Sequence, residues 1–199
     1  MRVQKALQEK PGIGDAMIVV DLQNDFLPGG SLPVPQGDQV LPSINKAIEK
    51  IHGKGLPLFF TRDWHPMNHC SFQSQGGLWP PHCIAETDGA AFAPGLKLPP
   101  DAVLISKATL PDQDAYSGFQ GTDLDRLLRE RRIQRLFVGG LATDYCVLNT
   151  VKDGLKLGYQ VCLLLDAVRA VDVRSGDGEQ ALKEMKKLGA VLIETAEMV

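Results

Sequence analysis

Short apolar runs alternate along the chain with segments in which apolar residues recur every three or four positions. The runs predict strands of a parallel sheet, because strands covered on both faces are apolar throughout. The periodic segments predict amphipathic helices, whose apolar side chains share one face. Strands are expected at 15–21, 56–61, 102–106, 136–138, 160–165 and 190–193. Helices are expected at 40–51, from an N-cap at Thr122 through Leu128, from Thr143 up to Gly158, and at 178–188.

This alternation predicts an α/β fold class, a single domain built on a doubly wound six-stranded parallel sheet with helices on both faces. A length of 199 residues with 44% apolar content suits one domain with a substantial core. Residues 1–14 are expected to form a loose N-terminal arm, because Pro11 and Gly12 would end any helical turn there. The domain is expected to span residues 15–199.

Charged residues and glycines directly follow several of the predicted strands. Asp21 closes the first strand, Asp63 follows the second, Lys107 the third and Gly139–Gly140 the fourth. Ligands of doubly wound folds bind beyond the carboxyl ends of the strands. Any one of these positions could be an ordinary solvated strand end, but four that lead into long loops predict a binding or catalytic site.

Cys146 lies where a strand, two glycines and a new helix follow one another. In the first turn of a helix the unpaired amides favour a thiolate, so the pKa of a cysteine there can fall to roughly 3.5–7.5. The same amides can stabilise an oxyanion. The sequence therefore predicts a nucleophilic thiolate at Cys146, with a small buried apolar residue as the alternative interpretation.

Three of the four histidines lie in the long loop after the second predicted strand. Asp63 and His65 are two positions apart, so their side chains point the same way from an extended segment. His82 can complete a three-ligand metal set with open positions for water and substrate. A fourth ligand at His69 stays open, and the alternative for the whole cluster is a polar surface loop. His52, on a polar helix face, has no expected role.

Charge and composition narrow the classes of partner. A net charge of −3 without a basic run gives no basis for binding nucleic acid or an anionic membrane, so a small-molecule partner is expected. The polar start of the chain and the lack of a long apolar stretch favour the cytoplasm. The four cysteines form no CxxC pair, which favours reduced thiols.

Five segments resemble the nicotinamidases, also called pyrazinamidases, of the isochorismatase-like hydrolase superfamily. They are VVDLQNDF at 19–26, TRDWHPMNHCSF at 61–72, WPPHC at 79–83, SKATLPDQDAYSGF at 106–119 and GGLATDYCV at 139–147. The similarity extends from Asp15 to about Ile193. It reinforces the predicted fold and implies hydrolysis of nicotinamide, and of pyrazinamide, to the acid and ammonia through a cysteine acyl-enzyme, as part of NAD salvage.

The resemblance also implies roles for individual residues. The implied catalytic residues are Asp21, Lys107 and Cys146, and the implied metal ligands are Asp63, His65 and His82. The implied oxyanion hole consists of the amides of Ala142 and Cys146, after a cis peptide between Leu141 and Ala142. The implied substrate-binding residues are Phe26, Trp79 and Tyr116. The implied cofactor is one divalent metal ion that anchors the pyridine ring, zinc foremost, with iron and manganese as alternatives.

Two other functions remain open at this point. Relatives that act on ureido or carbamoyl compounds share the three catalytic residues but generally lack the metal set. A non-catalytic metal-binding module could keep the fold without the activity. The sequence gives no role for the loop at 108–114, and a homo-oligomer is expected only from base rates.

Overall fold

The structure, a computed structural model, describes residues 10–199, so most of the arm predicted at 1–14 lies outside the described residues. The strands are β1 (Asp15–Val20), β2 (Leu58–Asp63), β3 (Val103–Lys107), β4 (Arg135–Leu141), β5 (Gln160–Arg169) and β6 (Val191–Ile193). The α-helices are α1 (Leu41–His52), α2 (Leu124–Glu130), α3 (Leu148–Lys156) and α4 (Asp177–Leu188). The predicted alternation of strands and helices is confirmed. No helix among these residues is long and apolar enough to cross a membrane.

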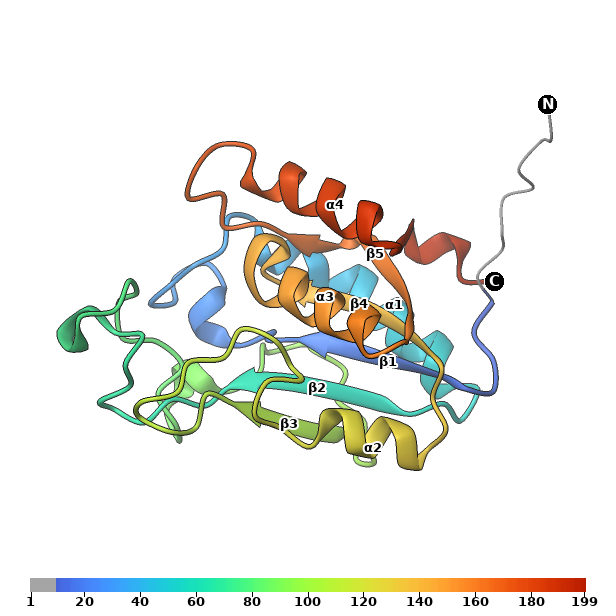
Figure 1. Ribbon diagram of the computed structural model, residues 1–199, viewed down its shortest axis with the longest axis horizontal. Helices are drawn as coiled ribbons and strands as arrows, with labels where there is room; N and C mark the ends of the chain where they lie inside the picture. The colour runs from blue at the N-terminus through green and yellow to red at the C-terminus, as the bar shows by residue number, and fades with distance from the viewer. Residues whose placement is uncertain (1–9) are drawn as a thin grey trace.

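The strands form one parallel sheet in the order β3-β2-β1-β4-β5-β6. The chain starts at the centre, builds one half of the sheet outward to β3, and then returns to build the other half from β4 (Figure 1). The strand order therefore reverses between β1 and β4. In such folds the crevice at the reversal is the usual ligand site.

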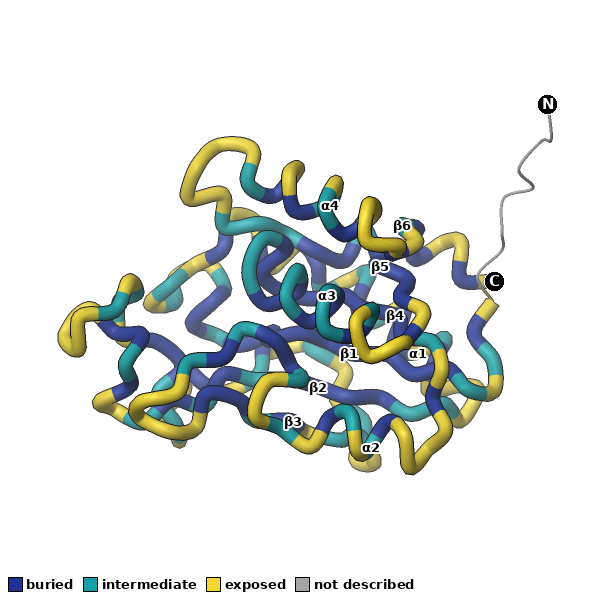
Figure 2. Tube along the Cα trace, in the orientation of Figure 1, coloured by how far each residue is buried: buried dark blue, intermediate teal, exposed yellow. Residues whose placement is uncertain are grey.

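Helices cover both faces of the sheet, as the apolar pattern predicts. Figure 1 shows α2, α3 and α4 on the near side and α1 behind the sheet. Alternate β1 residues point to opposite faces, so Met17 packs in the core under α1 and Ile18 in the core under α3. Burial is deepest along the central strands, and the outward faces of the helices are exposed (Figure 2).

Three details differ from the sequence prediction. β5 continues past residue 165 to Arg169, where its last residues pair with the end of β4. The carboxylate of Asp166 accepts hydrogen bonds from the backbone and hydroxyl of Thr195, just after β6. α2 begins at Leu124 with Asp123 as its N-cap; the hydroxyl of Thr122 instead donates to Gly118 O and accepts from Leu124 N. The segment after β4 begins with a π-helical turn, Thr143–Val147, before α3.

Gly140 permits the close approach of β4 to β1 at the centre of the sheet. A Cβ atom there would lie 2.1 Å from Val20 O, and the glycine has a φ of +126°. Gly154 in α3 has room for a side chain. The atom nearest to a Cβ added there would be Leu136 Cδ1, at 3.4 Å.

Replacing Gly140 by alanine should therefore lower the free energy of unfolding by about 3 kcal/mol or more, since backbone strain and overlap add. The matched variant Gly154→Ala should be neutral or should raise stability by about 0.5–1 kcal/mol, because it removes a helix-interior glycine. Urea unfolding followed by circular dichroism measures both values. Equal effects of the two substitutions would contradict this account of the β1–β4 contact.

Candidate active site

Three of the side chains expected at the carboxyl ends of the strands meet the predicted nucleophile beside the β1–β4 crevice. Asp21 follows β1, Asp63 ends β2, Lys107 ends β3, and Cys146 lies in the π-helical turn after β4. All four side chains are buried. Strand pairing sets part of this geometry, because Asp63 and Lys107 are register partners in the β2–β3 ladder.

Lys107 is the centre of the polar contacts at this end of the sheet. Its Nζ atom lies 2.9 Å from Asp21 Oδ2 and forms a second ion pair with Asp63 Oδ1. It also donates to Ala115 O at 3.2 Å and to Cys146 Sγ at 3.5 Å. Burial lowers the pKa of Lys107, but the two carboxylates outweigh it and raise the pKa well above its usual value. The ammonium group therefore keeps its charge at any physiological pH.

Asp21 is fully buried between Thr61 and Lys107. Its Oδ1 accepts a hydrogen bond of 2.6 Å from the hydroxyl of Thr61, and its Oδ2 lies 2.9 Å from the ammonium of Lys107. Burial raises the pKa of Asp21, and Lys107 opposes this rise while Asp63 adds to it. A buried carboxylate with a raised pKa suits a group that accepts and returns a proton.

The structure favours a neutral thiol at Cys146, whereas the sequence predicts a thiolate. Burial raises the pKa of its thiol well above the usual value, and the lowering effect of Lys107 does not offset this, with Asp21 and Asp63 adding to the rise. The expectation that a helix start would lower this pKa is therefore wrong for the structure as described, because desolvation dominates. A carboxylate oxygen of Asp21 lies within 4.8 Å of Cys146 Sγ.

Asp63, His65 and His82 form a compact group of metal-type ligands. One ligand atom from each lies within 4.8 Å of the others. The Nδ1 atoms of the two histidines face backbone carbonyls, Ala108 O at 3.2 Å and Pro80 O at 2.8 Å. Such contacts fix the ring so that Nε2 is the unprotonated donor. Burial and the neighbouring histidines lower the pKa of His65 to about 3, so it is neutral, as a ligand must be. One carboxylate and two imidazoles fit a divalent metal ion.

His69 lies beside this group but has other partners. Its ring stacks on that of His65, with 4.1 Å between the centroids. Its Nδ1 pairs with the hydroxyl of Ser71 at 2.8 Å, and its Nε2 with Gln113 O at 3.1 Å. Both ring nitrogens are thus used within the protein.

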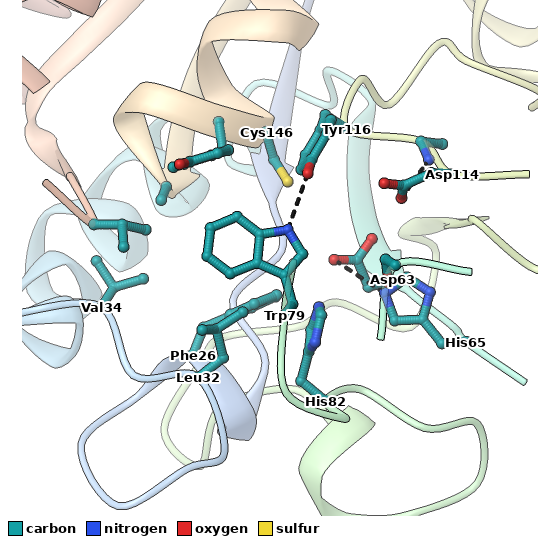
Figure 3. A pocket seen from close by; sticks show the side chains of 15 residues that line it. Phe26, Leu32, Val34, Asp63, His65, Trp79, His82, Asp114, Tyr116 and Cys146 are labelled. Atoms are coloured by element: carbon teal, nitrogen blue, oxygen red, sulfur yellow. Dashed lines mark hydrogen bonds and ion pairs between the residues drawn. The ribbon is translucent and has the colours of Figure 1, made fainter. Parts of the chain in front are cut away.

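An aromatic pocket connects the metal-type ligands to the cysteine. Figure 3 shows Trp79 between Phe26 and Tyr116, with Cys146 at one end and His82, Asp63 and His65 at the other. The indole of Trp79 donates a 2.9 Å hydrogen bond to the hydroxyl of Tyr116. The expected substrate-binding residues therefore line one pocket with Cys146. Its other lining residues are Leu32, Val34, Ser71, Asp114, Ala115, Ala142, Tyr145 and Val171.

Tyr145 is a pocket residue that the sequence interpretation missed. Its ring meets that of Trp79 edge-on, with 5.1 Å between the centroids. Its position next to Cys146 is the signal that could have identified it. Val171 was missed because β5 was expected to end at residue 165, several residues before this end of the sheet.

The peptide bond between Leu141 and Ala142 is cis, as the resemblance implies. Ala142 lies at the wall of the pocket next to the turn that carries Cys146. The loop at 108–114, which had no expected role, contacts the site. It contributes Asp114 to the pocket wall and the carbonyl of Gln113 to His69.

The raised pKa of Cys146 gives a direct test. In chelator-treated protein, iodoacetamide should alkylate Cys146 slowly at pH 7, and the rate should rise only at a pH well above that at which an ordinary cysteine ionises, because the thiolate is the reactive form. Lys107→Met should move this rise to still higher pH, since it removes the cation that lowers the pKa. Mass-spectrometric peptide mapping across pH measures both profiles, with the more exposed Cys70 as internal reference. Rapid labelling of Cys146 at pH 7 would contradict the assignment.

Comparison with known proteins agrees with this geometry. The isochorismatase domain pattern matches residues 15–197. The nicotinamidase of Escherichia coli is 39% identical over 203 residues, which cover 92% of this chain and 95% of that protein.

Two solved structures extend the match to three dimensions. The pyrazinamidase of Pyrococcus horikoshii in complex with zinc superposes with a TM-score of 0.88 at 51% identity, over 91% of this chain and 99% of that one. PnC1 from L. infantum in complex with nicotinate gives a TM-score of 0.89 at 36% identity, over 96% and 97%. A match that covers nearly the whole domain, together with a buried cysteine, lysine and aspartate at the strand ends, places the chain in the isochorismatase family of hydrolases.

Proposed function

We propose that the protein hydrolyses nicotinamide to nicotinate and ammonia, and pyrazinamide likewise, as a step of NAD salvage. The observation that carries this proposal is one aromatic pocket lined both by Cys146 and by the ligand set of Asp63, His65 and His82. Lys107 contacts the sulfur of Cys146 and pairs with Asp21 beside this pocket. The nicotinamidase and pyrazinamidase relatives support it.

Cys146 begins the reaction as a thiol, because burial raises its pKa. Its sulfur attacks the carboxamide carbon while Asp21 accepts the thiol proton, which makes attack possible without a standing thiolate. Thr61 holds the other oxygen of Asp21, so the accepting oxygen stays directed into the site. Burial raises the pKa of Asp21, which brings its basicity closer to that of a general base working near neutral pH.

The tetrahedral intermediate then places a negative oxygen near the turn after β4. The backbone amides of Ala142 and Cys146 act as its oxyanion hole. Asp21 returns its proton to the nitrogen, ammonia leaves, and a thioester remains on Cys146. Water attacks this thioester with Asp21 again as base, which releases nicotinate and restores the thiol.

Lys107 supplies a permanent positive charge to these steps. It offsets the buried charges of Asp21 and Asp63 and donates to the sulfur of Cys146. A lysine with a raised pKa does not lose its proton during turnover, so its role is electrostatic.

Asp63, His65 and His82 would hold the metal ion, with zinc as the proposed identity and iron or manganese also suited to this donor set. When bound, the ion supplies a Lewis-acid contact for the pyridine nitrogen, directly or through its water. Phe26, Trp79 and Tyr116 enclose the ring, and orientation of this kind accounts for much of the rate of an enzyme. An amidohydrolase for ureido or carbamoyl compounds has no use for such a ring site, which favours the nicotinamide assignment.

Ammonia release from nicotinamide tests the proposed activity. Cys146→Ala should lower kcat by about four orders of magnitude or more, because no nucleophile remains. Cys162→Ala is the matched control, since that buried cysteine lies in β5 within the core, and it should keep activity near wild type. Steady turnover by Cys146→Ala protein would rule out the acyl-enzyme route.

Benzamide, which lacks the ring nitrogen, tests the proposed role of the metal ligands. Its kcat/KM should be lower than that of nicotinamide by about two decades or more, because the ring loses its fixed orientation. His82→Ala should reduce nicotinamide hydrolysis far more than benzamide hydrolysis. Equal use of the two amides by the wild-type enzyme would mean that the metal ligands do not orient the substrate.

A further inference from the structure

The segment from Asp21 to Phe26 runs along the site. It carries Asp21 at one end and the pocket residue Phe26 at the other. Between them, Gln23 and Asp25 are both buried, although neither has a role in the proposed chemistry. Buried polar side chains are retained where they make specific hydrogen bonds.

Gln23 holds the backbone of the metal ligand Asp63 from both sides. Its Oε1 accepts a hydrogen bond of 2.7 Å from Asp63 N, and its Nε2 donates to Asp63 O at 2.7 Å. The same Nε2 donates to Ala90 O at 2.9 Å. The side chain is fully buried, so water cannot replace these contacts. Its amide therefore fixes the end of β2 where the carboxylate of Asp63 leaves the strand.

Asp25 holds the chain directly after the metal ligand His82. Its Oδ2 accepts a hydrogen bond of 2.7 Å from Cys83 N, and its Oδ1 accepts one of 3.1 Å from Ser31 N. A Cβ atom on Gly89 would lie 2.2 Å from Oδ2, so the loop is packed closely against the carboxylate. Cys83 has a φ of +46°, an uncommon conformation that these contacts help to maintain.

We propose that Gln23 and Asp25 are positioning residues that place the metal ligands Asp63 and His82 relative to the catalytic Asp21. This inference rests on the proposed function, because it takes those residues as metal ligands. Two of the three ligands are thus held through their backbones by the segment that also carries the general base. Metal affinity and the spacing between base and substrate then depend on the same few residues.

Gln23→Glu tests this proposal most directly. It keeps the shape of the side chain but replaces the amide that donates to Asp63 O and Ala90 O with an acceptor. Asp25→Asn is the second variant, and it replaces one of two accepting oxygens by a donor next to Cys83 N or Ser31 N.

Asn45 on α1 provides a matched control. Its Nδ2 donates to Gly95 O at 2.8 Å and its Oδ1 accepts from Lys97 N at 2.9 Å, so it holds a loop by the same chemistry as Gln23. Asn45 does not line the pocket. Asn45→Asp removes an amide donor of the same kind at a half-buried position, so its effect measures the cost of releasing a loop away from the site.

The experiment measures Zn²⁺ affinity of folded protein by competition with a chromophoric chelator at pH 7. Gln23→Glu and Asp25→Asn should each weaken Zn²⁺ binding by about 10–100-fold, as loss of groups that support metal ligands generally does. Asn45→Asp should stay within about twofold of wild type, because its loop carries no proposed ligand. The ratio of nicotinamide to benzamide kcat/KM should fall for the first two variants and not for the third.

Unchanged Zn²⁺ affinity and an unchanged substrate ratio in folded Gln23→Glu protein would overturn the inference for Gln23. If Gln23→Glu protein does not fold, the same two measurements on Asp25→Asn protein test the inference. A wild-type protein that binds no Zn²⁺ would instead overturn the proposed metal site, and the inference with it. The wild-type measurement therefore separates failure of the proposed function from failure of the positioning role.

Discussion

The charge of Lys107, buried completely at the end of β3, is the constraint on which the site depends. A buried ammonium without partners would cost several kcal/mol, so it requires compensating carboxylates within contact distance. Asp21 and Asp63 supply them from the two strands next in the sheet. The same three side chains thereby bring the proposed base, the proposed metal ligand and the sulfur of Cys146 to one place. The ion pairs that compensate the charge of Lys107 are thus the same contacts that set the geometry of the site.

Burial explains most of the difference between Cys146 and a solvent-exposed cysteine at a helix start, because desolvation raises the pKa of its thiol. Lys107 opposes this rise, while Asp21 and Asp63 add to it. A divalent ion on Asp63, His65 and His82 would add positive charge to this group. With such an ion bound, the proton affinity of the thiol would depend on that charge as well as on Asp21.

The sequence predicts what depends on local pattern and misses what depends on distant contacts. The strands, the helices on both faces and the strand-end positions of Asp21 and Lys107 follow from apolar periodicity. The length of β5 was underestimated, because the pattern cannot show that Thr195 satisfies Asp166. The pKa of Cys146 was predicted in the wrong direction, because desolvation arises from residues far along the chain. The local sequence pattern does not indicate a role for Gln23, because its hydrogen-bond partner Asp63 is 40 residues away.

The position of β1 has a consequence for how the protein is made. β1 is synthesised first, but its partner β4 begins only at Arg135, more than a hundred residues later. Until then the emerging chain offers one side of a mostly apolar central strand as an unpaired edge, which is prone to wrong pairing. Productive assembly must wait for the second half of the sheet, because pairing over such a separation is slow. Cys146 leaves the ribosome just after β4, so the nucleophile arrives as that edge is closed.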